Sequence, residues 1–305
     1  MEKTILIGTR ESQLALWQAN TVKDLLMEQG YRAELVHIKS EGDTDLKTPL
    51  YEIGVQGIFT RALDIALLNG DIDIAVHSMK DVPTMLPKGI VQAAVLERAS
   101  YKDLLVLKPG KHISTDGVPS VIATSSIRRK AQWLNRYPND KIENLRGNVN
   151  TRLRKVEEHE WNGAIFAAAG LERIGLRPKN AMELDWMLPA PAQGAIMVVS
   201  LDSNTYCLDA CADFHDDETA LCVNIERDFL RALLGGCSTP ISALAKVDNG
   251  HVLFEGNILS KDGSQKKTVS RTVGIGAAAN LGTAAAAELL ANGGQEILNG
   301  IRDEN

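Results

Sequence analysis

The sequence predicts an α/β fold in two units, followed by a smaller α+β domain. From Thr4 to Leu201, short apolar runs alternate with segments in which apolar residues recur at helical spacing. This alternation is typical of helices packed on a largely parallel sheet. From Glu218 onward the pattern changes to a long helix, three strands joined by tight turns and an Ala-rich helix.

The predicted elements give three domains. In the first, we expect strands at 4–8, 33–38, 72–76 and 90–96, with helices from Leu14 to a cap at Gly30 and from Ile58 to a stop at Gly70. In the second, we expect strands at 104–107, 121–123, 142–145 and 164–168, with helices at 127–136, 149–158 and 170–174. A crossing at 188–194 leads to a strand at 196–201 that could rejoin the first unit. The third has a helix at 218–234, strands at 241–247, 252–259 and 267–273, and a helix at 277–290. The domain boundaries are 1–98 with 195–214, then 99–194, then 215–305.

Length and composition exclude several classes of protein. The chain has 305 residues, 44% of them hydrophobic and 24% charged, as in ordinary globular proteins. No apolar run approaches the ~20 residues of a membrane span, and the first residues do not form a signal peptide. Because there are four cysteines and no secretion signal, we expect reduced thiols, a cytoplasmic location and no membrane partner.

Charge is unevenly distributed along the chain. The net charge of −6 argues against a nucleic-acid-binding protein. One short stretch is nevertheless basic and contains Arg128, Arg129, Lys130, Arg136, Arg146, Arg152, Arg154 and Lys155. This pattern indicates either a specific anionic ligand or a solvated helix face.

Four strand-to-helix junctions carry side chains suited to an anionic ligand. The carboxyl ends of strands line the ligand crevice in open α/β sheets, and backbone N–H groups at a helix start bind carboxylate or phosphate. The junctions are Gly8-Thr9-Arg10-Glu11-Ser12, His77-Ser78-Met79-Lys80-Asp81, Thr124-Ser125-Ser126-Ile127-Arg128-Arg129 and Arg146-Gly147-Asn148-Val149-Asn150-Thr151-Arg152. If all four open onto one cleft, they form a pocket for a ligand with many carboxylates. Otherwise they are ordinary helix caps and surface charges.

Two groups of cysteines could carry chemistry. Cys237 follows two glycines in a tight loop that would expose its thiol as a nucleophile or attachment point, although it could equally be a small loop residue. Cys207, Cys211 and His215 are spaced to share one helix face. A structural zinc site needs four ligands, however, and we assign no metal.

Taken together, these motifs resemble the porphobilinogen deaminase family over roughly residues 5–298. The motifs that carry the resemblance are Thr9-Arg10 with Ser12 and 14–18, then 73–83, 124–129, 145–149 with Thr151-Arg152, 168–171 with Arg173, Gln193-Gly194-Ala195, and Gly235-Gly236-Cys237 with Pro240-Ile241.

The resemblance implies two periplasmic-binding-protein-like α/β domains plus a small C-terminal α+β domain. It also implies a transferase of tetrapyrrole and haem biosynthesis, a hydroxymethylbilane synthase. Such an enzyme joins four porphobilinogen molecules head to tail, with loss of ammonia, on a covalent dipyrromethane cofactor, and releases hydroxymethylbilane by hydrolysis. A thioether at Cys237 would hold the cofactor.

The resemblance also assigns roles to single residues. Asp81 is the expected catalytic residue, because a carboxylate can stabilise the cation left by the loss of ammonia and can move pyrrole protons. Besides Cys237, the expected cofactor-binding residues are Ser78, Lys80, Thr124, Ser126, Arg128, Arg129 and Arg146. The expected substrate-binding residues are Arg10, Ser12, Asn148, Arg152, Arg173 and Gln193.

The sequence departs from the family pattern in a few loops. Glu41 and Gln56 stand where the family has basic residues, Glu52 stands where a Lys is common, and Ala190-Pro191-Ala192-Gln193 replaces Ala-Val-Gly-Gln. An alternative function is an anionic-ligand-binding module without catalysis, which would need neither Cys237 nor the third domain. A Cys-dependent hydrolase would need a His near Cys237 in space. We expect a monomer whose partner is the small molecule porphobilinogen.

Overall fold

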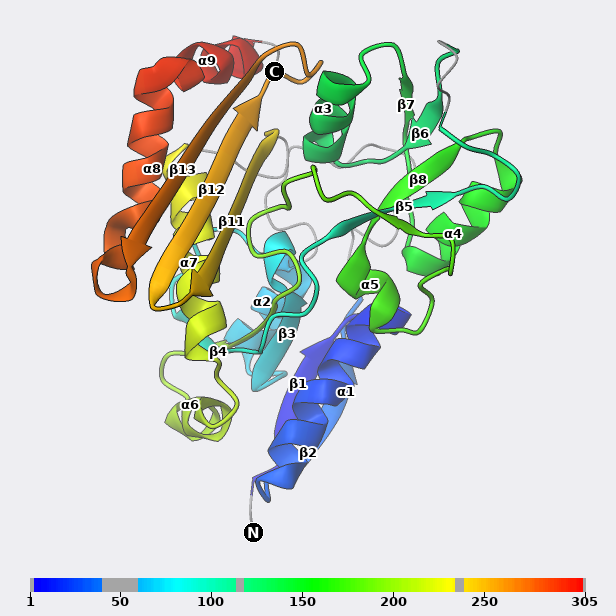
Figure 1. Ribbon diagram of the computed structural model, residues 1–305. Helices are drawn as coiled ribbons and strands as arrows, with labels where there is room; N and C mark the ends of the chain where they lie inside the picture. Colours follow the sequence, from blue (N-terminus) through cyan, green and yellow to red (C-terminus); the bar gives the residue numbers. More distant parts are fainter. Residues whose placement is uncertain (1–2, 40–59, 114–117, 234–238, 304–305) are drawn as a thin grey trace.

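The structure is a computed structural model that describes residues 3–39, 60–113, 118–233 and 239–303. Within these residues, two five-stranded sheets and one three-stranded sheet form the framework, and helices pack against each of them (Figure 1). The predicted α/β fold with a smaller C-terminal α+β part is therefore confirmed. The exact domain boundaries stay predictions.

The first sheet has the strand order β2-β1-β3-β10-β4. Its strands are β1 (Ile5–Thr9), β2 (Ala33–His37), β3 (Ile74–Ser78), β4 (Ile90–Val95) and β10 (Ile196–Leu201). β1 is parallel to β2 and β3, whereas β10 is antiparallel to both β3 and β4. The chain returns to this sheet at β10, as predicted. β2, β1, β3 and β4 therefore share one direction, so the expectation of a largely parallel sheet is confirmed, and β10 opposes them because the returning chain enters the sheet in the opposite direction.

Helices cover both faces of the first sheet. α1 (Gln13–Glu28) and α6 (Thr205–Ala212) pack on one face, and α2 (Arg61–Asn69) packs on the other together with the start of α7 (Asp217–Ala232). β3 is buried along nearly its whole length, as expected for a central strand covered on two faces. Gly70 ends α2 in the left-handed conformation, in agreement with the predicted stop.

The second sheet has the order β7-β6-β8-β5-β9. Its strands are β5 (Asp103–Leu107), β6 (Val121–Ala123), β7 (Lys141–Glu143), β8 (Gly163–Ala167) and β9 (Met182–Glu183). β6 is parallel to β7 and β8, and β5 is antiparallel to β8 and β9, so this sheet is also largely parallel, with β5 opposed to the other described strands. α4 (Val149–Glu158) and α5 (Ala168–Glu172) pack on one face, and α3 (Ile127–Arg136) packs on the other.

Two connections between the sheets lie side by side. The Ala99 N–H donates to the Gly194 carbonyl at 3.2 Å. Gly194 has a φ of +92°, and a Cβ there would lie 2.6 Å from the Ala99 carbonyl oxygen. Only glycine allows both this backbone conformation and this close approach. The predicted crossing at 188–194 is therefore one of two neighbouring segments that connect the two five-stranded sheets.

The third sheet is the predicted antiparallel meander of β11 (Ile241–Asp248), β12 (His251–Leu259) and β13 (Lys266–Gly274). One face is covered by α7, α8 (Leu281–Leu289) and α9 (Gln295–Asp303) (Figure 1). The helix expected at 277–290 begins late, because a 3₁₀ segment, η3 (Ile275–Asn280), precedes α8. A kinked segment, η4 (Leu290–Gly294), joins α8 to α9, and within it Asn292 and Gly293 have non-helical backbone angles.

A buried carboxylate, Glu226 on α7, ties the third domain to both connections. It accepts hydrogen bonds from Arg98 Nη1 and Nη2 at 2.6 and 3.0 Å. It also accepts the backbone N–H groups of Ala192 at 2.6 Å and Ala245 at 2.8 Å. Because Glu226 is fully buried, these four donors compensate for removing its charge from water.

We predict that Glu226→Ala lowers the free energy of unfolding by about 3–5 kcal/mol, because it leaves the Arg98 charge buried without its partner. The measurement is urea denaturation. The control is Glu288→Ala, which removes an exposed ion pair with Arg271 and should cost at most about 1 kcal/mol. Equal losses in the two variants would contradict the structural role of Glu226.

Candidate functional site

The four predicted junctions lie at or shortly after the carboxyl ends of β1, β3, β6 and β7. Ser12 is the N-cap of α1, Ser126 of α3 and Asn148 of α4. Their side-chain oxygens accept backbone N–H groups at 3.3, 3.5 and 2.9 Å, respectively. These residues therefore act as ordinary helix caps, and they set the directions of the helix starts at which the charged residues lie.

The turn after β3 brings the predicted catalytic carboxylate to a small cavity. Asp81 ends a single 3₁₀ turn, η2 (Met79–Asp81). The cavity, of about 90 Å³, is lined by Asp81 together with Arg10, Ser12 and Ser78, all of them predicted site residues. Residues from the ends of β1 and β3 thus meet, as the sequence predicted for these two junctions.

The imidazole of His77 also lines this cavity. Burial, and then the charge of Arg10, lower the pKa of His77 to about 4. The ring is consequently neutral at physiological pH and adds no positive charge to the site.

The arginines of α3 face a buried carboxylate. Asp103, at the start of β5, is fully buried and accepts hydrogen bonds of 2.7 Å from Nη2 of both Arg128 and Arg129. Nε of Arg129 adds a third bond at 3.1 Å. Burial alone would raise the pKa of the Asp103 carboxyl, but the charges of the two arginines outweigh burial and hold that pKa well below its ordinary value. Asp103 therefore fixes both guanidinium groups in place.

Gln193 connects Asp103 to Lys80. Its Nε2 donates to Asp103 Oδ1 at 2.9 Å, and its Oε1 accepts from Lys80 Nζ at 3.3 Å. Burial, and next the charge of Arg129, lower the pKa of the Lys80 ammonium to about 8. Lys80 is therefore charged at neutral pH and loses that charge in mildly alkaline solution.

Arg152 lies where charges from all four junctions act together. It is half-buried on α4, and its Nε donates to the Gly147 carbonyl at 2.7 Å. Burial is the main cause that lowers the pKa of Arg152, to about 10. The positive charges of Arg129, Arg146 and Arg10 also lower this pKa, whereas the negative charge of Asp81 raises it. Charged residues of all four junctions thus contribute to the electrostatic surroundings of this one guanidinium group.

The remaining predicted residues are not part of the described lining of the cavity beside Asp81. Nη2 of Arg173 donates to the Gly194 carbonyl at 2.7 Å, and its guanidinium lies over the Trp17 ring, with 5.7 Å to the centroid. Thr124 is buried, and its Oγ1 accepts the Ser126 N–H at 3.2 Å. Arg146 is buried as well.

A residue of the third domain holds the turn that carries Asp81. Arg227, buried on α7, donates from Nη1 to the Val82 carbonyl at 2.9 Å and from Nη2 to the Pro83 carbonyl at 2.6 Å. A longer contact of 3.4 Å joins Nη1 to the Met79 carbonyl. These carbonyl groups flank Asp81 on both sides, so Arg227 fixes the backbone from which the carboxylate projects.

Asp103 and Arg227 were not predicted from the sequence. At both positions the sequence has a feature that indicates a buried charge. Asp103 begins an apolar strand, and Arg227 falls among the apolar positions Val223, Ile225 and Phe229 of α7. Charged residues are almost never fully buried unless they are paired, so a charge inside an apolar pattern indicates a partner. The spacing of residues along the sequence does not identify that partner.

The structure contradicts one of the two cysteine interpretations and does not test the other. α6 ends at Ala212, so the expectation that Cys207, Cys211 and His215 share one helix face is wrong. His215 Nδ1 instead accepts the Val95 N–H at 3.0 Å, beyond the end of α6. No group of three metal-ligating side chains occurs in the described part of the chain. Cys237, Glu41, Glu52 and Gln56 lie outside the described residues.

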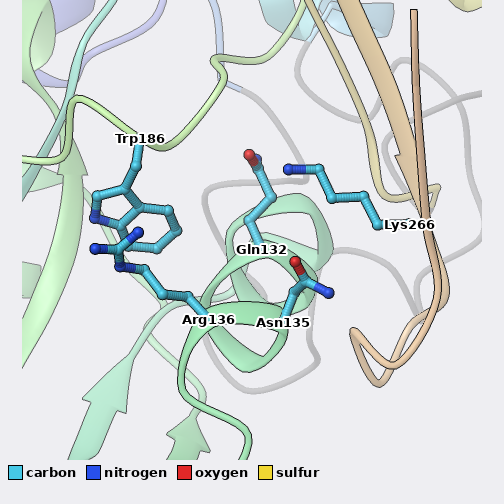
Figure 2. Close-up of a pocket in the computed structure, with 5 residues that line it drawn as sticks. All are labelled: Gln132, Asn135, Arg136, Trp186 and Lys266. Atoms are coloured by element: carbon cyan, nitrogen blue, oxygen red, sulfur yellow. The ribbon is translucent and has the colours of Figure 1, made fainter.

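None of the helices in the described ranges is long and apolar enough to cross a membrane. A larger cavity, of about 290 Å³, lies between α3 and β13, and its described lining contains none of the predicted site residues (Figure 2).

Comparison with known proteins decides the family. The model of the porphobilinogen deaminase dipyromethane cofactor binding domain matches residues 5–209, and that of the porphobilinogen deaminase C-terminal domain matches residues 220–291. The chain belongs to the porphobilinogen deaminase family. A porphobilinogen deaminase from Pelotomaculum thermopropionicum is 41% identical over 308 residues, covering 100% of this chain and 99% of its own length. A chloroplastic relative from Oryza sativa subsp. japonica is 42% identical and covers 88% of this chain and 77% of its own length.

Family membership makes the chain a transferase of tetrapyrrole biosynthesis with a dipyrromethane cofactor and porphobilinogen as substrate. The alternative of a binding module without catalysis is not favoured, because the C-terminal domain of the family is matched as well. Among solved structures, the methionine-binding protein MetQ covers 71% of this chain and 92% of its own, at 15% identity and a TM-score of 0.45.

We predict that Arg227→Ala lowers kcat strongly while KM changes little, because the turn that carries Asp81 loses its backbone anchor. Arg227→Lys, which keeps one cationic donor, should recover part of kcat. Steady-state kinetics of purified holoenzyme measure both constants. The matched control is Arg231→Ala, one turn further along α7, which removes only an exposed pair with Asp228. Equal kcat in the Arg227→Ala and Arg231→Ala variants would show that Arg227 does not position the turn.

Proposed function

We propose that the chain adds porphobilinogen molecules one at a time, with loss of ammonia at each addition, and releases hydroxymethylbilane by hydrolysis after four additions. The observation that carries this proposal is the cavity that Asp81 shares with Arg10, Ser12 and Ser78. The charges of Arg129 and Arg146, from the other two junctions, act together with those of Asp81 and Arg10 on Arg152. A pyrrole that bears an acetate and a propionate requires cations on several sides, and a cationic reaction intermediate requires a carboxylate among them.

The residues of this site fit a dipyrromethane group. Each of its rings carries carboxylates, and Arg128 Nε is a buried donor without a partner among the described residues. An unpaired buried donor is costly, and a bound carboxylate would satisfy it. We assign the binding of this group to Ser78, Lys80, Thr124, Ser126, Arg128, Arg129 and Arg146. When bound, the group supplies the free pyrrole position at which the chain begins.

Asp81 is the residue that we assign to catalysis. Its carboxylate lines the cavity beside Arg10, where a substrate carboxylate would be held. Loss of ammonia from the aminomethyl group of porphobilinogen leaves a cation, which an adjacent carboxylate stabilises. The same carboxylate can accept the proton that the pyrrole ring loses when the new bond forms. We assign substrate binding to Arg10, Ser12, Asn148, Arg152, Arg173 and Gln193.

We assign covalent attachment to Cys237. The other cysteines are buried thiols, and burial raises the pKa of Cys207 to about 11, of Cys211 to about 12 and of Cys222 to about 11. Such thiols remain protonated at neutral pH and are poor nucleophiles. A monomeric state, a cytoplasmic location and the absence of nucleic-acid partners remain predictions from the sequence.

Intact mass of the purified active protein tests the attachment. We expect the polypeptide mass plus that of two linked pyrrole units in the wild type, the same addition in Cys207→Ala, and the bare polypeptide mass in Cys237→Ala. Active wild-type protein at the bare polypeptide mass would overturn the assignment.

We predict that Asp81→Asn lowers turnover by about 10² or more, because the amide keeps the size of the side chain but neither stabilises a cation nor accepts a proton. Circular dichroism should show that the fold is retained. Turnover close to the wild-type value would remove Asp81 from the mechanism.

We predict that KM for porphobilinogen rises as the pH increases through about 8. A Lys ammonium whose pKa is lowered is charged below that pKa and neutral above it. Neutral Lys80 no longer balances the cofactor carboxylate to which we assign it, and that carboxylate then repels the carboxylates of the incoming porphobilinogen. Lys80→Arg keeps its charge and should remove the rise. KM measured between about pH 7 and about pH 9 at constant ionic strength tests this, since the reference pKa of Arg lies above about 12. A rise of equal size in both proteins would assign it to another group.

A further inference from the structure

The cavity between α3 and β13 has a lining unlike that of the site around Asp81. It is formed by Gln132, Asn135 and Arg136 of α3, by Trp186 before β10, and by Lys266 at the start of β13 (Figure 2). Its volume of about 290 Å³ lies near the lower limit of small-molecule sites, which begin at about 300 Å³.

The cavity is rich in positive charge. Arg136 and Lys266 bring two cations into the cavity, and its described lining contains no carboxylate. Neither side chain makes an ion pair with another residue in the described part of the chain, whereas many surface cations of this protein do. Two cations beside one cavity, without an ion-pair partner among the described residues, favour a ligand that carries more than one negative charge.

The cavity wall holds Arg136 in a defined position. The Arg136 guanidinium lies over the Trp186 ring at 5.0 Å from the centroid, and its Nε donates to the Tyr137 hydroxyl at 3.3 Å. Trp186 is itself packed against Trp133 and Tyr137. The stacking contact uses one face of the guanidinium group, and the hydrogen bond to the Tyr137 hydroxyl uses Nε. The terminal N–H groups therefore remain available to bind an anion. A preorganised cation loses less entropy on binding than a free surface side chain.

Hydrogen bonds connect the floor of the cavity to two domains. Gln132 is buried and exchanges hydrogen bonds with the backbone of Leu188 at 2.9 and 3.0 Å, and it donates to Ser242 of β11 at 3.1 Å. Asn135 Nδ2 donates to the Gly263 carbonyl in the β12–β13 turn at 2.8 Å. Leu188 also accepts a bond from Arg128 of the candidate site. A ligand in this cavity would therefore link three parts of the molecule: the second sheet, the connection at 188–194 between the two five-stranded sheets, and the third domain.

We propose that this cavity is a second, non-catalytic binding site for a small multivalent anion, held between Arg136 and Lys266. The chemistry that fits is a compact di- or tricarboxylate, or a phosphate, with oxygen acceptors on opposite sides. Binding would fasten β13 to α3 and so stabilise the arrangement of the third domain against the second sheet. The site uses no residue assigned to catalysis or to cofactor binding.

The test is titration of wild-type holoenzyme with citrate and, separately, with inorganic phosphate, followed by calorimetry at constant ionic strength. We expect saturable binding of at least one of the two with a Kd of about 1 mM or below. Arg136→Gln and Lys266→Gln should each weaken that binding about tenfold or more, since each removes a charge-assisted contact. Trp186→Phe should keep the binding but lose any ligand-dependent change in tryptophan fluorescence.

The matched control is Lys267→Gln. It makes the same charge change one residue along β13, and its ammonium lies beside Gly293, on the opposite face of the strand from Lys266. Binding should be unchanged in this variant. Citrate binding alone identifies a carboxylate site, and phosphate binding alone identifies a phosphate site. Failure of both anions to bind wild-type protein, or binding that survives both Arg136→Gln and Lys266→Gln, would overturn the proposal.

Discussion

The contact between Asp103 and the two arginines of α3 is the interaction on which the candidate site depends. Two adjacent guanidinium groups repel each other, and both are buried, so neither would remain there without a counter-charge. Asp103 supplies it, and through Gln193 the same carboxylate also sets the position of Lys80. One buried acid thus organises cations that come from two different sheets.

The third domain contributes to this site as a support. Glu226 of α7 holds the two connections between the sheets, and Arg227, the next residue, holds the turn that carries Asp81. α7 ends at Ala232, a few residues before Cys237. The helix that leads toward the assigned attachment residue therefore also fixes the backbone of the assigned catalytic residue, so the third domain does more than present a thiol.

The sequence predicted the architecture well where the physical cause was local. α3 and α4 were predicted with their observed boundaries, because Ser126 and Asn148 are strong caps. The direction of β10 depends on contacts between distant segments and could not be read from a local pattern. The partners of Arg128 and Arg227 were missed for the same reason. Ala192 has a left-handed φ of 61° at the position where the family pattern has Gly. The sequence showed that substitution, but its backbone conformation, held by Glu226, required the structure.

The central claim is that Asp103 orders the cations that receive the cofactor. Its most direct test is the intact mass of soluble, folded Asp103→Asn protein, compared with wild type and with Asp103→Glu as the charge-retaining variant. An amide cannot balance Arg128 and Arg129, so the account predicts that most Asp103→Asn chains have the bare polypeptide mass, whereas Asp103→Glu retains part of the cofactor addition. Full cofactor addition in folded Asp103→Asn protein would contradict it.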